Sequence, residues 1–579
     1  MTYRKPFSQI HDGLEGIAAL RMSRRDALRR AALLALASPL AGGLLAACGG
    51  SNNSTATSSG GGGGAASTSS ASGGSGATTT AKQGGTLTVA LNLEPDNLDP
   101  AVTPFAVSHT VMMNIYDTLV WRGQDGTFVP GLATKWDVSS DGKTYTLTLR
   151  EGPKFHDGTD FNADAVKFAF DHIVDPASHS GFAANLLGPY DHTEVVDSTT
   201  AKVVFTDEFA PFLDGASQAF LGIVSPTAVQ NDKTAFLQHP VGTGFMKFDE
   251  WVLKDHITLS RNPDYNWGPS IFDHQDAAYL DKIVFRFYTD DPTRLAALES
   301  GDVQDIETIA YSEQARIKGD NKYQVLTGFF PGIPSIHMID TTVAPTDDIA
   351  VRQAINFATD RASINQVALF SASEPALGPL WKSTPSYWSG VEDYYPFDLS
   401  KAQDALDKAG WTAGSDGIRQ KDGKKLTVTW AQTPSADSYA ELLQAQLRKA
   451  GIDLQINKMA TSAAFDAIEK SQVNIAAIGW ISSDPVILSN LFLSTNIDGG
   501  YAWTKYSDPT LDDALNKGEK SLDESARDTA YQDAQKIIMD NALINPLFGS
   551  LRTIGASSKF AGLKLDFRKY QWLYDVHTA

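Results

Sequence analysis

Pairs of adjacent carboxylates are side chains whose type and spacing could serve hydrolysis. Asp290-Asp291 and Asp347-Asp348 are examples. Each pair directly precedes a helix-like run, where acidic side chains are stabilised by the positive end of the helix dipole. The sequence therefore favours helix capping over catalysis at both positions.

No complete catalytic or nucleotide-binding motif accompanies these carboxylates. Gly-x-Ser-x-Gly and His-Glu-x-x-His are absent, and Gly142-Lys143-Thr144 lacks the glycine that a phosphate-binding loop carries five residues earlier. The eleven histidines do not cluster, and none lies between His337 and His577. Because a transition metal needs several converging ligands, we expect no metal site and no cofactor, and we predict a protein without enzymatic activity.

Cys48 is the only cysteine, which excludes an intramolecular disulfide and a cysteine-based metal cluster. Leu45-Ala46-Ala47-Cys48 looks like a bacterial lipobox, in which the thiol accepts a diacylglyceryl group. The several acyl chains of a mature bacterial lipoprotein hold it firmly on a membrane. Residues 49–83 are almost entirely Gly, Ser, Thr and Ala, a composition typical of a flexible linker. We predict lipidation of Cys48 and a tether at 48–83.

The segment before Cys48 has the composition of an export signal. A basic stretch around Arg24-Arg25 is followed by an apolar stretch, Ala31 to Ala47, that is too short and too interrupted to span a bilayer comfortably. The paired arginines resemble the twin-arginine export motif, but Ala27 stands where a bulky apolar residue is preferred, so the ordinary secretory route stays open. We predict that residues 1–47 direct export to the periplasm or cell envelope, where the lipid is the only membrane anchor.

The remaining chain is large and acidic. A length of 579 residues with 42 % hydrophobic residues predicts at least two packed units. Residues 1–47 carry seven basic and three acidic side chains, which leaves 41 basic and 65 acidic residues in the rest. Such a charge repels phosphate backbones, so nucleic-acid binding is not expected.

Strands and helices are predicted in alternation from Gly84 onward. Thr86 to Leu91 is typical of a strand, Trp136 to Arg150 of a hairpin turning at Asp141-Gly142, and Asn162 to Ile173 of an amphipathic helix capped by Asn162. Further strands are predicted at Ile257 to Leu259 and Ile283 to Phe287, and helices at Pro292 to Ser300, Ile349 to Ala358, Asp398 to Ala409 and Tyr439 to Ala450. Gly410 and Gly451 end the last two helices, and an extended run follows each. This order predicts an α/β fold with crossover connections in the second half.

Several blocks between Gly84 and Phe567 together resemble the extracellular solute-binding proteins of the peptide and nickel transport class, which serve ATP-driven importers. The most specific blocks run from Pro130-Gly131-Leu132-Ala133 to Lys154-Phe155-His156-Asp157-Gly158. Later blocks in the same order are Gly242-Thr243-Gly244, Arg261-Asn262-Pro263-Asp264-Tyr265, Leu298-Glu299-Ser300-Gly301-Asp302, Val351-Arg352-Gln353-Ala354-Ile355-Asn356 and Ala409-Gly410-Trp411.

The resemblance implies a two-lobed fold of the periplasmic-binding-protein type, with the first lobe enlarged by an extra subdomain and two hinge crossings. Lobe I would comprise 84–334 and a C-terminal return at 545–579, and lobe II would comprise 335–544. The crossings are expected near Ser335 to Asp340 and near Asn545 to Phe548.

The resemblance also implies ligand-binding residues between the lobes. The segment after Leu98-Asp99-Pro100 nominates Thr103, Pro104, Phe105 and Ala106. Gly479-Trp480 matches the family's Gly-Trp, which nominates Trp480 as a ring that packs on the ligand. Many peptide binders hold an aspartate three residues later to pair with the ligand's amino terminus. Here Ser483 occupies that position and Asp484 is adjacent, so both are candidates.

The implied function is capture of a peptide or related extended solute for the membrane subunits of an ABC-type importer, by a monomeric protein. Within binding, the alternative is a non-peptide solute such as a sugar, an opine-like conjugate or a chelated metal. A secreted hydrolase using the same cleft is the alternative outside binding.

Overall fold

The computed structural model describes residues 81–433 and 437–579. Ala81–Ala579 forms one compact unit. The predicted export signal, Cys48 and the linker up to residue 80 lie outside the described residues. Within the described ranges, no helix is both long and apolar enough to cross a membrane.

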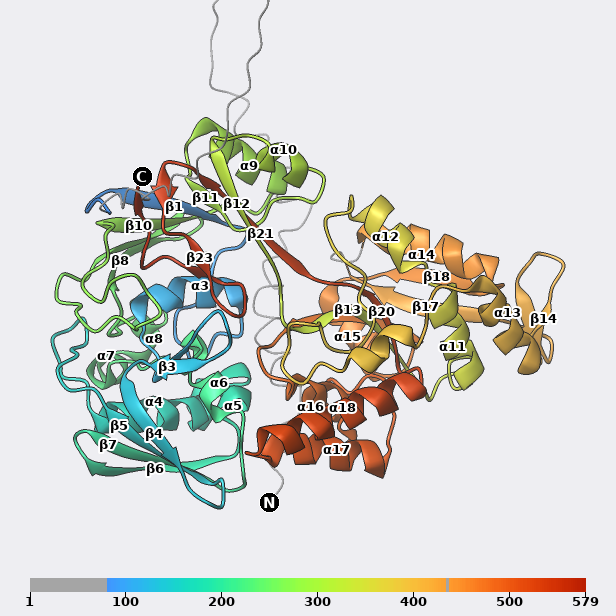
Figure 1. The fold of residues 1–579 in the computed structure, drawn as a ribbon, viewed down its shortest axis with the longest axis horizontal. Coiled ribbons are helices and arrows are strands. Elements are labelled where there is room, and N and C mark those ends of the chain that lie inside the picture. Colours follow the sequence, from blue (N-terminus) through green and yellow to red (C-terminus); the bar gives the residue numbers. More distant parts are fainter. Residues whose placement is uncertain (1–80, 434–436) are drawn as a thin grey trace, which may run out of the picture. The chain divides into compact units, whose positions relative to one another are not determined.

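The part that we call lobe I contains a seven-stranded sheet in the order β12-β21-β11-β1-β10-β9-β8 (Figure 1). The strand predicted at Thr86 to Leu91 is confirmed as β1, which is central and pairs in parallel with β10 and β11. The strands are β1 (Thr86–Leu91), β8 (Met246–Val252), β9 (His256–Arg261), β10 (Lys282–Phe287), β11 (Asp305–Ile306), β12 (Tyr323–Phe329) and β21 (Leu551–Ser557). Helices α3 (Ala106–Ile115), α7 (Pro226–Asn231), α8 (Lys233–Phe236), α9 (Asp291–Ser300) and α10 (Gln314–Lys318) also belong to this lobe.

A second, antiparallel sheet of lobe I forms the extra subdomain, with the order β4-β5-β7-β6. The predicted hairpin is confirmed by β4 and β5, which pair in antiparallel fashion. The predicted helix is confirmed as α4, whose first turn is capped by the Asn162 side chain accepting from the Ala165 amide. The elements are β4 (Ala133–Val138), β5 (Thr144–Leu149), α4 (Ala163–Val174), α5 (Phe182–Leu187), β6 (Tyr190–Asp197), β7 (Thr200–Phe205) and α6 (Phe212–Gly215).

Short strand pairs complete lobe I. They are β2 (Val120–Arg122) with β3 (Phe128–Pro130), β22 (Phe560–Ala561) with β25 (His577–Thr578), and β23 (Lys564–Leu565) with β24 (Gln571–Trp572). The last two pairs lie in the C-terminal return, which packs Trp572 and Tyr574 into the large apolar core of the lobe.

The part that we call lobe II is built on a five-stranded sheet in the order β18-β17-β19-β13-β20. Its strands are β13 (Gly332–Ile339), β17 (Thr427–Gln432), β18 (Asp453–Lys458), β19 (Ile475–Ile481) and β20 (Ile544–Phe548). The crossover prediction is confirmed, because β17 is parallel to β18 and β19, with helices between them in the chain. A small sheet of β14 (Thr412–Ala413), β15 (Arg419–Lys421) and β16 (Lys424–Lys425) is added.

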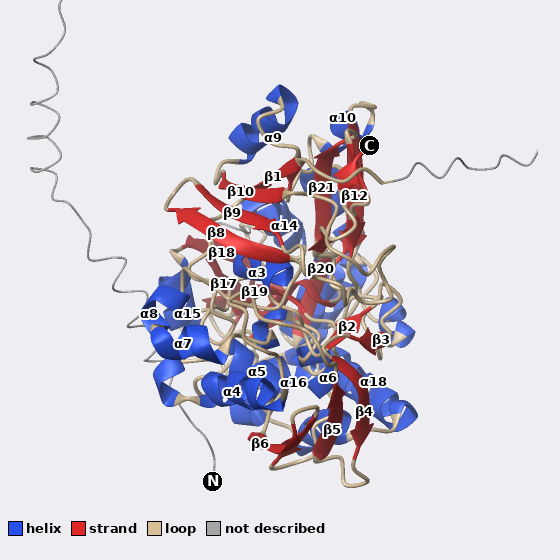
Figure 2. Cartoon of the chain, turned by 90° about the vertical axis from the view of Figure 1, so that its left-hand side faces the viewer, coloured by secondary structure: helices blue, strands red, loops and turns tan. Residues whose placement is uncertain are grey.

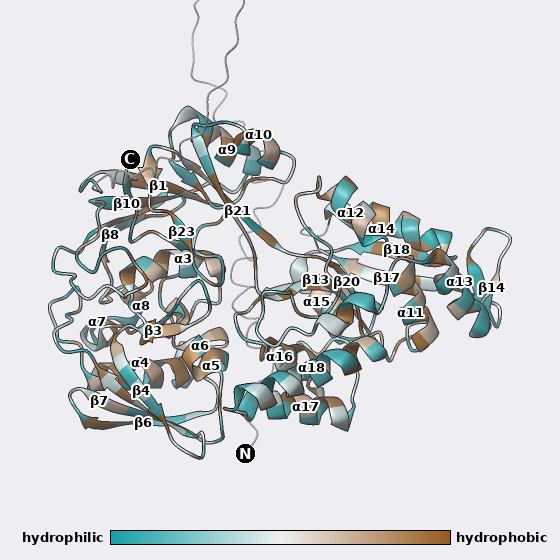
Figure 3. Ribbon diagram, viewed as in Figure 1, coloured by the Kyte–Doolittle hydropathy of each residue, from teal (hydrophilic) through white to brown (hydrophobic). Residues whose placement is uncertain are grey.

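Helices lie on both sides of the five-stranded sheet in Figure 1, and in Figure 2 lobe I faces the viewer, with β8 to β10 above and β4 to β6 below. The helices of lobe II are α11 (Ile349–Ala358), α12 (Arg361–Ala368), α13 (Leu399–Lys408), α14 (Asp437–Lys449), α15 (Thr461–Glu469), α16 (Ile487–Phe492), α17 (Pro509–Lys520) and α18 (Glu524–Asp540). Hydrophilic residues colour much of the visible surface of α14 and α17 (Figure 3), while Leu511 and Leu515 of α17 are buried against the lobe.

The carboxylate pairs lie at helix starts, as the sequence predicts. Asp290 accepts a hydrogen bond from the Thr293 amide at the start of α9, and Asp348 accepts one from the Ala350 amide at the start of α11. The predicted stops also hold, because Gly410 and Gly451 each have a φ of 87°, which only glycine adopts without strain. Asp290 and Asp348 therefore cap helices, as the sequence predicts.

The chain passes between the two large sheets twice. Residues 330–331 connect β12 to β13, and residues 549–550 connect β20 to β21. The two crossings are neighbours, since the Phe330 amide donates to the Ser550 carbonyl at 3.0 Å.

The crossings expected at 335–340 and 545–548 fall largely inside β13 and β20, because these apolar runs continue the lobe II sheet. We therefore propose lobe boundaries after residues 331 and 548 in place of 334 and 544. The assignment of 84 onward and of the C-terminal return to lobe I keeps its predicted order.

Candidate functional site

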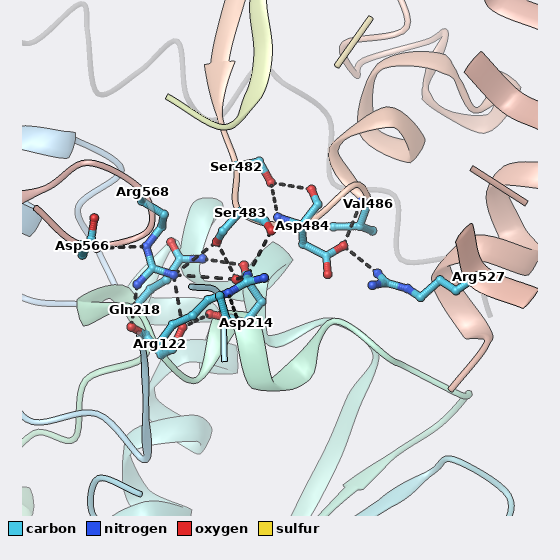
Figure 4. Close-up of polar contacts among 12 residues, drawn as sticks. Arg122, Asp214, Gln218, Ser482, Ser483, Asp484, Val486, Arg527, Asp566 and Arg568 are labelled. Atoms are coloured by element: carbon cyan, nitrogen blue, oxygen red, sulfur yellow. Dashed lines mark hydrogen bonds and ion pairs between the residues drawn. The ribbon is translucent and has the colours of Figure 1, made fainter. Parts of the chain in front are cut away.

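The loop after β19 carries two of the sequence-predicted site residues, Ser483 and Asp484, and lies against lobe I. Strand β19 ends at Ile481, and α16 begins at Ile487. Between them, the Ser482 hydroxyl donates to the Asp484 carbonyl at 2.8 Å and accepts from the Asp484 amide at 3.3 Å. This local bonding fixes the loop and directs Ser483 toward lobe I (Figure 4).

Ser483 is fully buried and contacts three charged side chains of lobe I. Its hydroxyl donates to Asp214 and accepts from Arg568 Nη1 at 3.2 Å, while its carbonyl accepts from Arg122 Nη1 at 2.9 Å (Figure 4). Asp214 comes from α6, Arg122 from the end of β2 and Arg568 from the C-terminal return. We call Arg122, Asp214, Ser483 and Arg568 the interlobe cluster, because a lobe II serine joins three residues of lobe I.

Two arginines of the interlobe cluster stabilise the charge of Asp214. Burial alone would raise the pKa of Asp214, but the charges of Arg122 and Arg568 and the hydrogen bond from Ser483 hold that pKa below its ordinary value. The remaining oxygen of Asp214 accepts from Gln218 Nε2 at 3.1 Å. Asp214 is therefore ionised and fully occupied by protein donors.

Asp484 is also occupied by protein groups. Its Oδ1 accepts from Arg527 Nη2 at 2.6 Å and from the Val486 amide at 2.8 Å. Both partners belong to lobe II, so Asp484 connects the loop to α18 and to the start of α16. Its side chain is only 9 % exposed.

A cavity of about 440 Å³ lies beside this loop and is lined by both lobes. Lobe I contributes α5, α6 and the segment between β7 and α6, and lobe II contributes the end of β19, α16 and the last turn of α17. The wall includes aromatic, amide and charged side chains: Phe182, Phe209 and Trp480; Asn185, Gln218, Asn490 and Asn516; Asp207, Glu208, Asp214, Glu519 and Lys520. Such a mixture of apolar area and convergent polar groups is typical of a small-molecule site.

The predicted site residues divide between the cavity and other positions. Trp480 lines the cavity, and its ring meets that of Tyr501 edge to face with centroids 4.8 Å apart. Ser483 and Asp484 are not among the described residues that line it. The role of all three in ligand binding stays a prediction.

The segment at 103–106 lies at the start of α3. Thr103 is buried and its hydroxyl donates to Asp96 Oδ1 at 2.6 Å. Pro104, Phe105 and Ala106 are exposed, with Phe105 at 43 %. None of the four is among the described residues that line the cavity, so their predicted contact with ligand is untested.

Sequence reasoning missed Asp214, Arg122, Arg568 and Glu519. Asp214 and Ser483 are 269 residues apart, so no local pattern links them. The available signal was Arg122 at the end of an apolar run, since a charge there needs a partner. Within the described ranges, no group of three or more His, Cys, Asp and Glu side chains could hold a metal ion.

Two lobes that are joined by two adjacent crossings and enclose a cavity define a two-lobed binding protein of the periplasmic type. Comparison of the sequence with protein-family models is consistent with this class. The chain belongs to the bacterial extracellular solute-binding proteins, family 5, because the model of the family's middle part matches residues 127–499.

Known proteins agree with this membership. The chain is 30 % identical to the glutathione-binding protein GsiB of Escherichia coli over 475 residues, which is 80 % of this chain and 88 % of GsiB. The periplasmic binding protein DppA of Helicobacter pylori, solved with the peptide STSA, is 26 % identical with a TM-score of 0.71 and covers 86 % of this chain and 98 % of its own. NikZ of Campylobacter jejuni, solved with Ni(L-His), is 25 % identical with a TM-score of 0.71, at 85 % and 99 % coverage.

Proposed function

We propose that this protein captures a peptide or peptide-like solute in the cavity between its lobes and presents it to the membrane subunits of an ABC-type importer. The observation that carries this proposal is the cavity itself, to which both lobes contribute an aromatic, amide-rich wall. A solute that touches both walls has more contacts when the lobes are closed, so it favours the closed population. GsiB, which is named a glutathione-binding protein, and DppA, which was solved with the peptide STSA, support this ligand class.

We propose binding without catalysis. The family and its structural relatives are binding proteins. In the cavity wall, Asp214 is held by two arginines and a serine, which leaves it unsuited to act as a general base. Recovery of an added peptide unchanged after prolonged incubation would support binding alone, and cleavage of the peptide would support the hydrolase alternative.

The ligand class can be tested by native mass spectrometry of gently purified protein, followed by calorimetry. We expect a retained peptide, and saturable heats with glutathione or with tri-alanine. A retained sugar, opine or metal chelate, with no heat from any peptide, would favour the non-peptide alternative. NikZ, solved with a nickel complex of histidine, makes a chelate the first non-peptide probe to test.

We further propose that a lipid on Cys48 anchors the exported, monomeric protein and that residues 48–83 tether it. The support is the lipobox-like sequence Leu45 to Cys48 behind a basic and apolar leader with twin arginines. Cys48→Ala should move the protein from the membrane fraction to the soluble fraction in a detergent partition assay. Continued sedimentation of the exported, cleaved variant with membranes would contradict the lipid anchor.

A further inference from the structure

Most acidic side chains around the cavity already have a cationic partner. Asp214 pairs with Arg122, Asp207 with Lys520 Nζ at 2.6 Å, and Asp484, just behind the wall, with Arg527. Glu519 and Glu208 differ, because no basic residue in the described part of the chain forms a salt bridge with either, and of these two only Glu519 is partly buried. Lys520 is the only basic residue among the described residues that line the cavity, and Asp207 occupies it.

Glu519 is partly buried and held in position. It lies in the last turn of α17, and its carbonyl accepts from the Ala210 amide of lobe I at 3.2 Å. Burial and the charge of Asp484 raise the pKa of its side chain, and they outweigh the Ser489 hydroxyl and the charges of Lys520 and Arg527, which lower it. The negative end of the α17 dipole adds to this field. An ionised Glu519 is therefore costly in the empty cavity, and a positive charge beside it would remove that cost.

We propose, on the basis of the proposed function, that the cavity recognises a solute bearing an ammonium group and that Glu519 binds this group. Two sources share this chemistry: the free amino terminus of a peptide and a basic side chain. Glu208 is exposed at the cavity rim and adds to the negative potential that draws a cation in.

The cavity also offers apolar and aromatic surface for the rest of the solute. Phe182, Phe209 and Trp480 line it, and aromatic faces attract a neighbouring cation as well as packing on an alkyl chain. An additional anionic group would meet no free basic side chain among the lining residues. The wall therefore selects for positive over negative charge at this position.

The test is calorimetry of the full chain with four probes: Ala-Ala-Ala, N-acetyl-Ala-Ala-Ala, N-acetyl-Ala-Lys-Ala and cadaverine. In Glu519→Gln we expect affinity to fall by about 10- to 100-fold for each probe that carries an ammonium group and binds the native chain, the range for losing a charged hydrogen bond. The neutral acetylated tripeptide should change by less than about threefold. Asp513→Asn is the matched control, because Asp513 is an exposed acid of the same helix.

The probes distinguish the two sources of the ammonium group. Preference for Ala-Ala-Ala indicates an amino terminus, and preference for N-acetyl-Ala-Lys-Ala indicates a basic side chain. Thermal melting verifies that Glu519→Gln is folded, and Glu519→Asp should retain part of the affinity because it retains the charge.

Different results of this experiment would overturn the inference and the proposed function. Equal binding of acetylated and free peptides, unchanged by Glu519→Gln, would overturn the inference and leave peptide binding intact. Binding of cadaverine alone, lost in Glu519→Gln, would support the inference and overturn peptide as the ligand class. If no probe with an ammonium group binds, the inference is overturned.

Discussion

Two carboxylates on the cavity wall, Asp214 and Glu519, have opposite surroundings. Both carboxylate oxygens of Asp214 are bound by protein groups, namely Arg122, Arg568, Ser483 and Gln218. Glu519 is partly buried with a raised pKa and has no salt bridge in the described part of the chain. The difference indicates that one carboxylate joins the lobes and the other is left for the solute.

Removing Asp214 should produce the largest effect. Asp214→Ala leaves Arg122 and Arg568 buried without their shared carboxylate, and breaking such a pair costs about 3–5 kcal/mol of unfolding free energy. Denaturant unfolding of the ligand-free protein measures this loss. Asp207→Ala is the control, since it removes a solvent-exposed pair with Lys520 and should cost less than about 1 kcal/mol. Equal losses of unfolding free energy in the two variants would show that the buried pairs of Asp214 stabilise the fold no more than the exposed pair of Asp207.

Trp480→Ala tests whether the cavity wall is used for binding. We expect binding of a peptide to weaken by about 1–3 kcal/mol, because an aromatic contact is lost while the fold remains. Titration and thermal melting on one variant separate this outcome from a core role. A core residue would instead cost about 3–5 kcal/mol of folding stability with unaltered affinity in the folded fraction.

Asp305 is a buried carboxylate that has no salt bridge in the described part of the chain and is not among the residues that line the cavity. Burial raises its pKa to about 7; Glu307 also raises the pKa, while Gln571 at 2.7 Å and Arg552 lower it. Because the folded state holds this proton more tightly than the unfolded chain, the contribution of Asp305 to stability decreases as pH rises from about 4 to about 7.

Comparison with Asp305→Asn isolates this contribution, since the variant cannot titrate. The stability of the native chain relative to the variant should decrease by about 1–2 kcal/mol over that pH range, measured by thermal unfolding at several pH values. A constant difference between the two proteins would show that Asp305 does not titrate there.

Ser483→Ala should give the smallest effect. It removes the hydroxyl contacts with Asp214 and Arg568 but keeps the carbonyl contact with Arg122, a loss of about 0.5–1.5 kcal/mol. Because these contacts join the two lobes, we expect the variant to favour a more open arrangement, and small-angle scattering should show a larger mean radius at subsaturating ligand. Ser521→Ala, whose hydroxyl bonds within lobe II, should not change the radius.

The sequence predicted those helices and strands whose defining residues lie close together in the chain. Asn162, Gly410 and Gly451 act within a few residues of their own position, so capping and stop patterns predicted their helices. The cavity did not follow from the sequence, because it depends on how lobes far apart in sequence pack. Glu519 is an acid in the last turn of α17, and its surroundings combine Asp484 and Arg527, distant in the sequence or on another helix, with Ala210 of the other lobe.

Trp480, nominated by the family resemblance, differs from the other predicted site residues in lining the cavity, and its contact with a ligand stays a prediction. The same resemblance nominated Asp484, whose contacts are with Arg527 and Val486, and Thr103, whose contact is with Asp96. A motif identifies a position in the fold, but the partner that occupies a side chain is decided by residues elsewhere.

The adjacency of the two crossings constrains how the protein releases its solute. Each crossing has only two residues, and Gly549 has no room for a side chain, because a Cβ there would lie 2.4 Å from the Trp381 ring. Because both crossings are this short, we expect the lobes to turn at this point, and the interlobe cluster lies beside it, since the Ser482 amide donates to the Pro331 carbonyl at 3.1 Å. We expect rotation at the crossings to separate Ser483 from Asp214 and widen the cavity, while the hydrogen bonds within each sheet remain.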